Sequence, residues 1–207
     1  MHVFIRTRIT NPNTVVKAKA FAVEIGQMAS AIAGRPITPF HNMFGGTPGA
    51  IGWSTTIADL ADLGDIEAKL AADPGYQKKL ADNASLWVHN AEDRVTQIVS
   101  SGLTSSTNLL YASLTAVLRT DKFADAVVFG VQMQEYLQSA GFSGCFGVNS
   151  FSSYGEVGWL TGFDSLADVD RLGTFVMSDE RYASRAKAAA DLFEPRSGVN
   201  QLVRRLG

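Results

Sequence analysis

The strongest constraint on the fold of this chain is a match between its two halves. When the sequence is shifted by 106 positions, Gly52-Trp53 aligns with Gly158-Trp159, and Asp73 and Tyr76 also meet identical residues. Between positions 52 and 87 the alignment needs no gap and contains 10 identities in 36 positions, whereas chance would give roughly 2 or 3. A repeat of this length indicates a duplicated domain and not a short solenoid unit.

The same match predicts where one module ends and the next begins. We expect a first module at residues 1–100 and a second module at residues 109–207. Residues 101–108 are polar and rich in serine, as a flexible linker is expected to be.

Each module is predicted to have the element order βαββααβ. In the first module, alternating side chains in His2–Thr10 indicate a strand. Apolar residues spaced three and four apart then predict a helix that stops at Gly34 and Pro36. The other predicted elements are strands at 37–44, 50–57 and 94–99 with helices at 59–70 and 75–88, and then strands at 113–119, 142–150, 156–163 and 199–204 with helices at 123–140 and within 165–190.

This order is the split βαβ, or ferredoxin-like, arrangement. The predicted fold class is therefore α+β, with a four-stranded antiparallel sheet in each module and helices on one face of each sheet. The second face of each sheet retains apolar residues that must also be covered. We expect the two antiparallel sheets to face each other as an intrachain α/β barrel.

The element order and two local motifs resemble a known superfamily. Gly52-Trp53 opens the third strand, and Leu70–Tyr76 (Leu-Ala-Ala-Asp-Pro-Gly-Tyr) begins a later helix. With the order βαββααβ, these features resemble the dimeric α/β-barrel proteins, and most of all their NIPSNAP and antibiotic-biosynthesis-monooxygenase branches. The resemblance covers both halves. It implies the fold, but the superfamily includes cofactor-free oxygenases, polyketide cyclases, isomerases, haem enzymes and proteins without known activity, and the fold does not choose among them.

Composition excludes several classes of protein. The 207 residues have a formal net charge of −2 and a pI of about 5.9, so no basic surface for nucleic acid is predicted. No signal peptide is visible, and no run of about 18 apolar residues predicts a membrane span. The single cysteine, Cys145, rules out an internal disulfide and favours the reducing cytoplasm.

No cofactor is expected. The three histidines, His2, His41 and His89, have no counterparts in the other module, and no metal-binding motif accompanies them. One cysteine is too few for a multi-cysteine metal site. We therefore predict neither an essential metal nor haem.

Arg6 and Arg8 are candidate ligand-binding residues. They share one face of the first strand because side chains alternate along a strand. If Val3, Ile5 and Ile9 face the helices, both arginines enter the space between the sheets. The matching positions of the second module are read as Thr115, Val117 and Arg119, so the two modules differ at this place.

A partly buried arginine needs an anionic partner, and two kinds are open for Arg6. A protein carboxylate such as Glu24, Glu67 or Asp93 would make Arg6 structural. In the absence of a carboxylate, an anionic ligand would be the better explanation.

His41 is the candidate acid or base, because histidine titrates near neutral pH. A lone histidine in an apolar strand can equally be a hydrogen-bonded structural residue. Asn42, Asn149 and Tyr154 are further candidates for ligand binding, although Tyr154 lies in a loop tip that can simply face solvent. The repeated pairs Trp53 and Trp159, Tyr76 and Tyr182, and Trp87 and Phe193 are interpreted as packing residues, because both modules need them.

Two functions remain open at this point. The first is binding of a small aromatic or anionic molecule, with cofactor-independent oxygenation or cyclisation as the reaction if there is one. The alternative is a non-catalytic structural or assembly protein of the same fold. A homo-oligomer is left open. A cavity lined by Arg6 or His41 would favour the first function, and solid packing the second.

Overall fold

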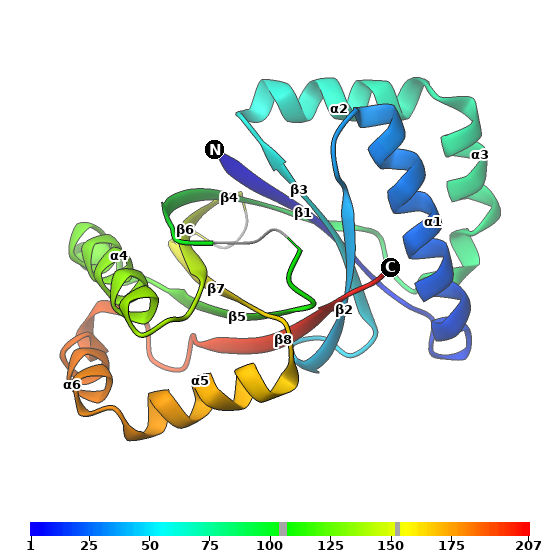
Figure 1. The fold of residues 1–207 in the computed structure, drawn as a ribbon. Coiled ribbons are helices and arrows are strands. Elements are labelled where there is room, and N and C mark those ends of the chain that lie inside the picture. The colour runs from blue at the N-terminus through cyan, green and yellow to red at the C-terminus, as the bar shows by residue number, and fades with distance from the viewer. Residues whose placement is uncertain (104–106, 152–153) are drawn as a thin grey trace. The chain divides into compact units, whose positions relative to one another are not determined.

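The computed structural model describes residues 1–103, 107–151 and 154–207 and has an α+β fold with antiparallel strands (Figure 1). Part of the predicted linker, 104–106, and positions 152–153 lie outside the described residues. The chain divides into two compact units, Met1–Thr96 with Arg204–Gly207, and Gln97–Val203. No helix among the described residues is both long and apolar enough to cross a membrane.

The same order of helices and strands occurs twice along the chain. The elements from the N-terminus are β1 (His2–Ile9), α1 (Val15–Ala33), β2 (Thr38–Gly45), β3 (Ala50–Ile57), α2 (Leu60–Ala72), α3 (Pro74–Asp82) and β4 (Glu92–Ser101). They are followed by β5 (Leu110–Val117), α4 (Phe123–Ser139), β6 (Gly144–Phe151), β7 (Glu156–Phe163), α5 (Leu166–Ser178), α6 (Glu180–Ala188) and β8 (Val199–Arg205). Short 3-10 turns precede α1 and α4 and follow α3 and α6.

The strand register shows which positions of the two units correspond. In the first unit β3 pairs antiparallel with β1 and β2, and in the second β7 pairs with β5 and β6. Arg6 lies opposite Trp53, and Leu114 lies opposite Trp159. The positions that correspond to Arg6 and Arg8 are therefore Leu114 and Ala116. The predicted counterparts, which began at Thr115, were displaced by one residue.

A tryptophan ties the sheet of each unit to its long helix. Trp53 Nε1 donates a hydrogen bond to the carbonyl oxygen of Ala22 in α1, at 2.9 Å. Trp159 Nε1 donates to the carbonyl oxygen of Gly130 in α4, at 3.1 Å. Each bond satisfies an indole N–H that would otherwise be buried without a partner.

Aromatic rings fill the space between sheet and helix in the second unit. Phe146 of β6 is fully buried, and its ring centroid lies 5.0 Å from that of Trp159. A Cβ atom at position 130 would lie 2.2 Å from the Phe146 ring, so glycine is required there for the ring to fit. Phe129 and Phe193 pack around the same tryptophan.

One predicted helix ends earlier than expected. The pattern over residues 75–88 predicts a single helix, but α3 ends at Asp82, and Asn83 caps it by donating from Nδ2 to the carbonyl oxygen of Lys79 at 2.9 Å. After a 3-10 turn, Trp87 is extended and forms an isolated β-bridge with Thr10. The early end of α3 places the Trp87 ring against β1 instead of on a helix.

Candidate functional site

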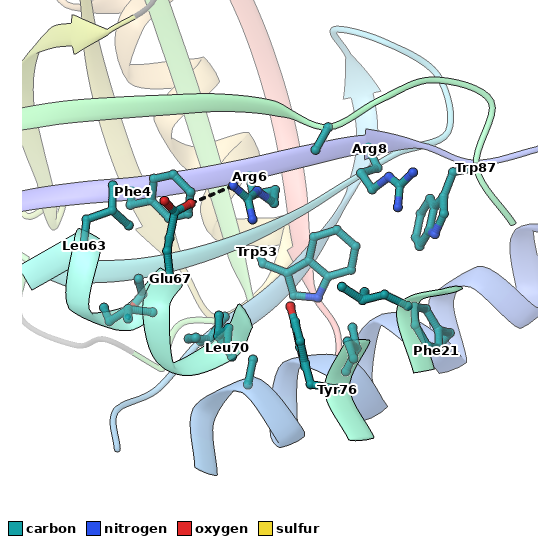
Figure 2. Close-up of a pocket in the computed structure, with 17 residues that line it drawn as sticks. Phe4, Arg6, Arg8, Phe21, Trp53, Leu63, Glu67, Leu70, Tyr76 and Trp87 are labelled. Atoms are coloured by element: carbon teal, nitrogen blue, oxygen red, sulfur yellow. Dashed lines mark hydrogen bonds and ion pairs between the residues drawn. The ribbon is translucent and has the colours of Figure 1, made fainter. Parts of the chain in front are cut away.

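A cavity of about 190 Å³ lies inside the first unit, between the β1–β3 face and helices α1, α2 and α3 (Figure 2). Its walls are mainly aromatic and aliphatic, with a few polar groups. A mostly apolar cavity with few polar groups is the usual form of a small-molecule site. The lining residues are Phe4, Arg6, Arg8, Phe21, Ile25, Ala29, Ile37, Trp53, Thr55, Leu63, Ile66, Glu67, Leu70, Tyr76, Leu80, Trp87 and Ala91.

Arg6 and Arg8 lie on the helix-covered face of β1, which corrects the expectation that they face the space between the sheets. They share this face with Phe4, and all three line the cavity with residues of α1, α2 and α3. Strand alternation groups these side chains correctly, but it does not say which group faces the helices.

Arg6 already has two carboxylate partners. Its Nε and Nη2 atoms donate to the two carboxylate oxygens of Asp93 at 2.7 and 2.6 Å, and Nη2 also donates to Glu67 Oε1 at 3.0 Å. The hydrogen bond to Asp93 is the main reason that the pKa of Arg6 is raised. The condition for a structural Arg6 is therefore met. Because all three side chains remain 36–51% exposed, the pairs contribute only about 0–1 kcal/mol to stability.

Arg8 is in the opposite situation. None of the described residues places a carboxylate in an ion pair with it, and its buried Nε atom has no hydrogen-bond partner. Nη2 makes only a long, 3.5 Å contact to the carbonyl oxygen of His89, and the guanidinium lies 5.1 Å from the centroid of the Trp87 ring. Burial, followed by the positive charge of Arg6, lowers the pKa of Arg8. The cavity therefore holds an uncompensated cation with an unused donor.

Three aromatic residues complete the site, and the repeat led us to interpret all three as packing residues. Trp53 and Trp87 meet edge to face with centroids 5.6 Å apart. Burial raises the pKa of Tyr76, so its hydroxyl stays protonated at neutral pH. No described residue makes a hydrogen bond to this hydroxyl, and Figure 2 shows the hydroxyl end of Tyr76 pointing toward Trp53.

The other candidates lie elsewhere. His41 does not line the cavity; its Nδ1 lies 3.2 Å from the carbonyl oxygen of Asn42, and burial lowers its pKa. Asn42 donates to the carbonyl oxygens of Gly45 and Thr47 and so closes the β2–β3 turn. Asn149 and Tyr154 belong to the second unit, where Tyr154 is 82% exposed. Of the predicted site residues, Arg6 and Arg8 line the cavity.

The described residues contain no group of three or more His, Cys, Asp or Glu side chains that could hold a metal ion. Cys145 is buried in β6, and burial raises its thiol pKa to about 11. Because the thiolate is the nucleophilic form, Cys145 is not an activated nucleophile.

Comparison with known proteins identifies the fold. No protein-family model matches the chain, and no curated protein matches its sequence. A "putative monooxygenase" from Fusobacterium nucleatum superposes over 100% of this chain and 92% of its own, with a TM-score of 0.71 and 7% identity. A second "putative monooxygenase", from Lactobacillus acidophilus, covers 100% and 94% of the two chains with a TM-score of 0.64 and 12% identity.

An anthrone oxidase-like protein also matches, with a TM-score of 0.60 and 11% identity over 100% of this chain and 93% of its own. The predicted resemblance to the dimeric α/β-barrel proteins is thereby confirmed at the level of the fold. At these identities the likeness concerns the fold alone.

Proposed function

We propose that this protein binds a small aromatic anion in the cavity of the first unit. The observation that supports this most strongly is Arg8, whose guanidinium lines an aromatic cavity and has no carboxylate partner among the described residues. A partly buried charge without a counter-charge is unfavourable, and an anionic ligand would reduce that cost. Arginine is also the side chain best suited to holding a carboxylate in two parallel hydrogen bonds.

The size and walls of the cavity define the rest of the ligand. A cavity of about 150 Å³ lined by aliphatic and aromatic groups is known to hold one benzene molecule, and this one measures about 190 Å³. Trp53, Phe21 and Trp87 offer ring faces and edges for stacking. The ligand class that fits is a single-ring aromatic acid.

The reaction proposed for this site is cofactor-independent, of the oxygenase or cyclase kind. The names of the neighbours, two "putative monooxygenases" and an anthrone oxidase-like protein, support this class without fixing a substrate. In such an oxygenation the electron-rich substrate, once deprotonated, supplies all four electrons: it loses two hydrogens and gains one oxygen atom as a ketone or quinone carbonyl, and the other atom of dioxygen leaves as water with the two protons. The mainly apolar lining favours the chemistry because it limits the access of water to the reactive intermediate. Glu67 is the carboxylate that lines the cavity and can take the proton.

The non-catalytic alternative applies to the second unit. We propose that the two units are copies of one ferredoxin-like module and that the second copy is structural. The repeated element order and the paired indole hydrogen bonds support the first part. The ring cluster around Phe146 and Trp159, and the absence of charge at Leu114 and Ala116, support the second.

Arg8→Met should remove the preference of the protein for an anionic ligand. Benzoate should bind the unaltered protein about 10–100-fold more tightly than neutral benzyl alcohol, because a hydrogen bond to a charged group contributes about 1.5–3 kcal/mol. In the variant, the two affinities should come within about threefold of each other. Isothermal titration calorimetry measures both.

Arg171→Met is the matched control, since Arg171 also lies over an aromatic ring, at 5.0 Å from the Phe142 centroid, but in the second unit. Its variant should keep the preference for benzoate. Equal affinities for benzoate and benzyl alcohol in the unaltered protein would contradict the proposed function.

A further inference from the structure

The two ends of the cavity differ in charge. At one end stands Arg8 beside Trp87 and Phe21, with no carboxylate paired to it among the described residues. At the other end Arg6 is bound by Glu67 and Asp93, so that one guanidinium and two carboxylates give a formal charge of −1. Figure 2 shows Glu67 with Phe4 and Leu63 at this second end, and Trp53 and Tyr76 between the two.

The two arginines mark the two ends of the cavity. Arg6 and Arg8 are two residues apart on β1 and point to the same face, which separates their Cα atoms by about 6.6–6.8 Å. Glu67 Oε1 lies 3.0 Å from Arg6 Nη2, so Glu67 is held at the Arg6 end. A ligand that reaches both Arg8 and Glu67 must therefore carry its two polar groups on opposite sides of the ring.

Glu67 has an oxygen to spare. Only Oε1 accepts a hydrogen bond in the described part of the chain, from Arg6. Oε2 is therefore available to a donor that enters the cavity. A second anionic group at this end would instead meet the excess negative charge of Glu67 and Asp93.

From these three observations we infer that the site selects aromatic acids that carry a hydrogen-bond donor on the ring position opposite the acid, the class of 4-hydroxybenzoate and 4-aminobenzoate. The acid group binds Arg8, and the hydroxyl or amino group donates to Glu67. The inference rests on the proposed function, because it assumes that the acid occupies the Arg8 end. It adds the orientation of the ligand and the chemistry of its second substituent.

A series of ring substituents tests the inference on the unaltered protein. Calorimetric affinities are measured for 4-hydroxybenzoate, 3-hydroxybenzoate, 4-methoxybenzoate, benzoate and terephthalate. 4-Hydroxybenzoate should bind about 10–100-fold more tightly than 4-methoxybenzoate, which cannot donate to a charged acceptor. Terephthalate, with a second carboxylate in place of the donor, should bind more weakly than benzoate.

Glu67→Met then assigns the effect to one side chain. The variant keeps the Arg6 pair with Asp93, and in it 4-hydroxybenzoate and 4-methoxybenzoate should come within about threefold of each other. Asp65→Asn on the same helix is the control and should keep the full preference, because Asp65 does not line the cavity.

The outcomes distinguish a failure of this inference from a failure of the proposed function. If all the acids bind through Arg8 with similar affinity, the inference is overturned and the proposed function stands. If none of the acids binds, both are overturned. A preference for 4-hydroxybenzoate that survives in Glu67→Met also overturns the assignment to Glu67.

Discussion

Phe146→Ala should destabilise the protein by about 3–5 kcal/mol, the usual cost of removing a fully buried phenylalanine ring. Phe146 has no exposed surface, and its ring occupies the space that Gly130 leaves open against α4. The indole of Trp159 would lose its nearest aromatic neighbour, 5.0 Å away, and the cavity left behind could collapse only in part because α4 and β6 are both fixed by backbone hydrogen bonds. Chemical denaturation followed by circular dichroism measures the change.

Phe151→Ala on the same strand is the matched control. Its side chain is 57% exposed, so its removal should change the free energy of unfolding by less than about 1 kcal/mol. Similar losses for the two variants would show that the second unit is not held together by the ring cluster around Trp159.

Ala29→Phe should abolish ligand binding, with a loss of affinity of at least about 100-fold, while leaving the fold intact. Ala29 is buried in α1 and lines the cavity. A phenyl ring added there enters the cavity of about 190 Å³, which is large enough for one ring. The new ring would thus occupy the place of the ligand, much as Phe146 occupies the interior of the second unit.

Because the added ring fills existing space, the melting temperature should stay the same or rise, in contrast to ordinary overpacking, which costs about 1–3 kcal/mol. Ala29→Ser changes the volume little and should keep most of the affinity. Benzoate binding to Ala29→Phe with unaltered affinity would place the ligand outside this cavity.

The sequence allowed most of the elements to be predicted, because each leaves a local signal. Gly34 stops α1 in the left-handed conformation, and the third strand of each half, Ala50–Ile57 and Glu156–Phe163, was predicted with its observed bounds. The helix predicted over 75–88 was too long, because Asn83 ends it through its own hydrogen bond to Lys79 while the apolar spacing continues to Leu86 and Trp87. A periodic pattern cannot show this kind of local cap.

The site was harder to predict because it depends on where the packed side chains leave a cavity. The sequence identified Arg6 and Arg8, but it could not show that Asp93 and Glu67 pair with the first and leave the second unpaired. Trp53 and Tyr76 were interpreted as packing residues because both are repeated. A repeated residue can nevertheless line a cavity in one copy and a filled interior in the other, since the difference is made by neighbours such as Phe146. The difference between the modules at Arg6 and Arg8 was noted from the sequence, but the counterparts were placed one residue too far along, and the strand register gives Leu114 and Ala116.

The most direct test of the aromatic-anion site uses the three tryptophans, which give three indole N–H resonances in a ¹H–¹⁵N spectrum. Trp53 and Trp87 line the cavity of the first unit, whereas Trp159 lies in the filled interior of the second. On titration with 4-hydroxybenzoate, the resonances of Trp53 and Trp87 should shift and saturate together, and that of Trp159 should stay in place. Shifts confined to Trp159, or no shift in any of the three, would contradict the proposed site.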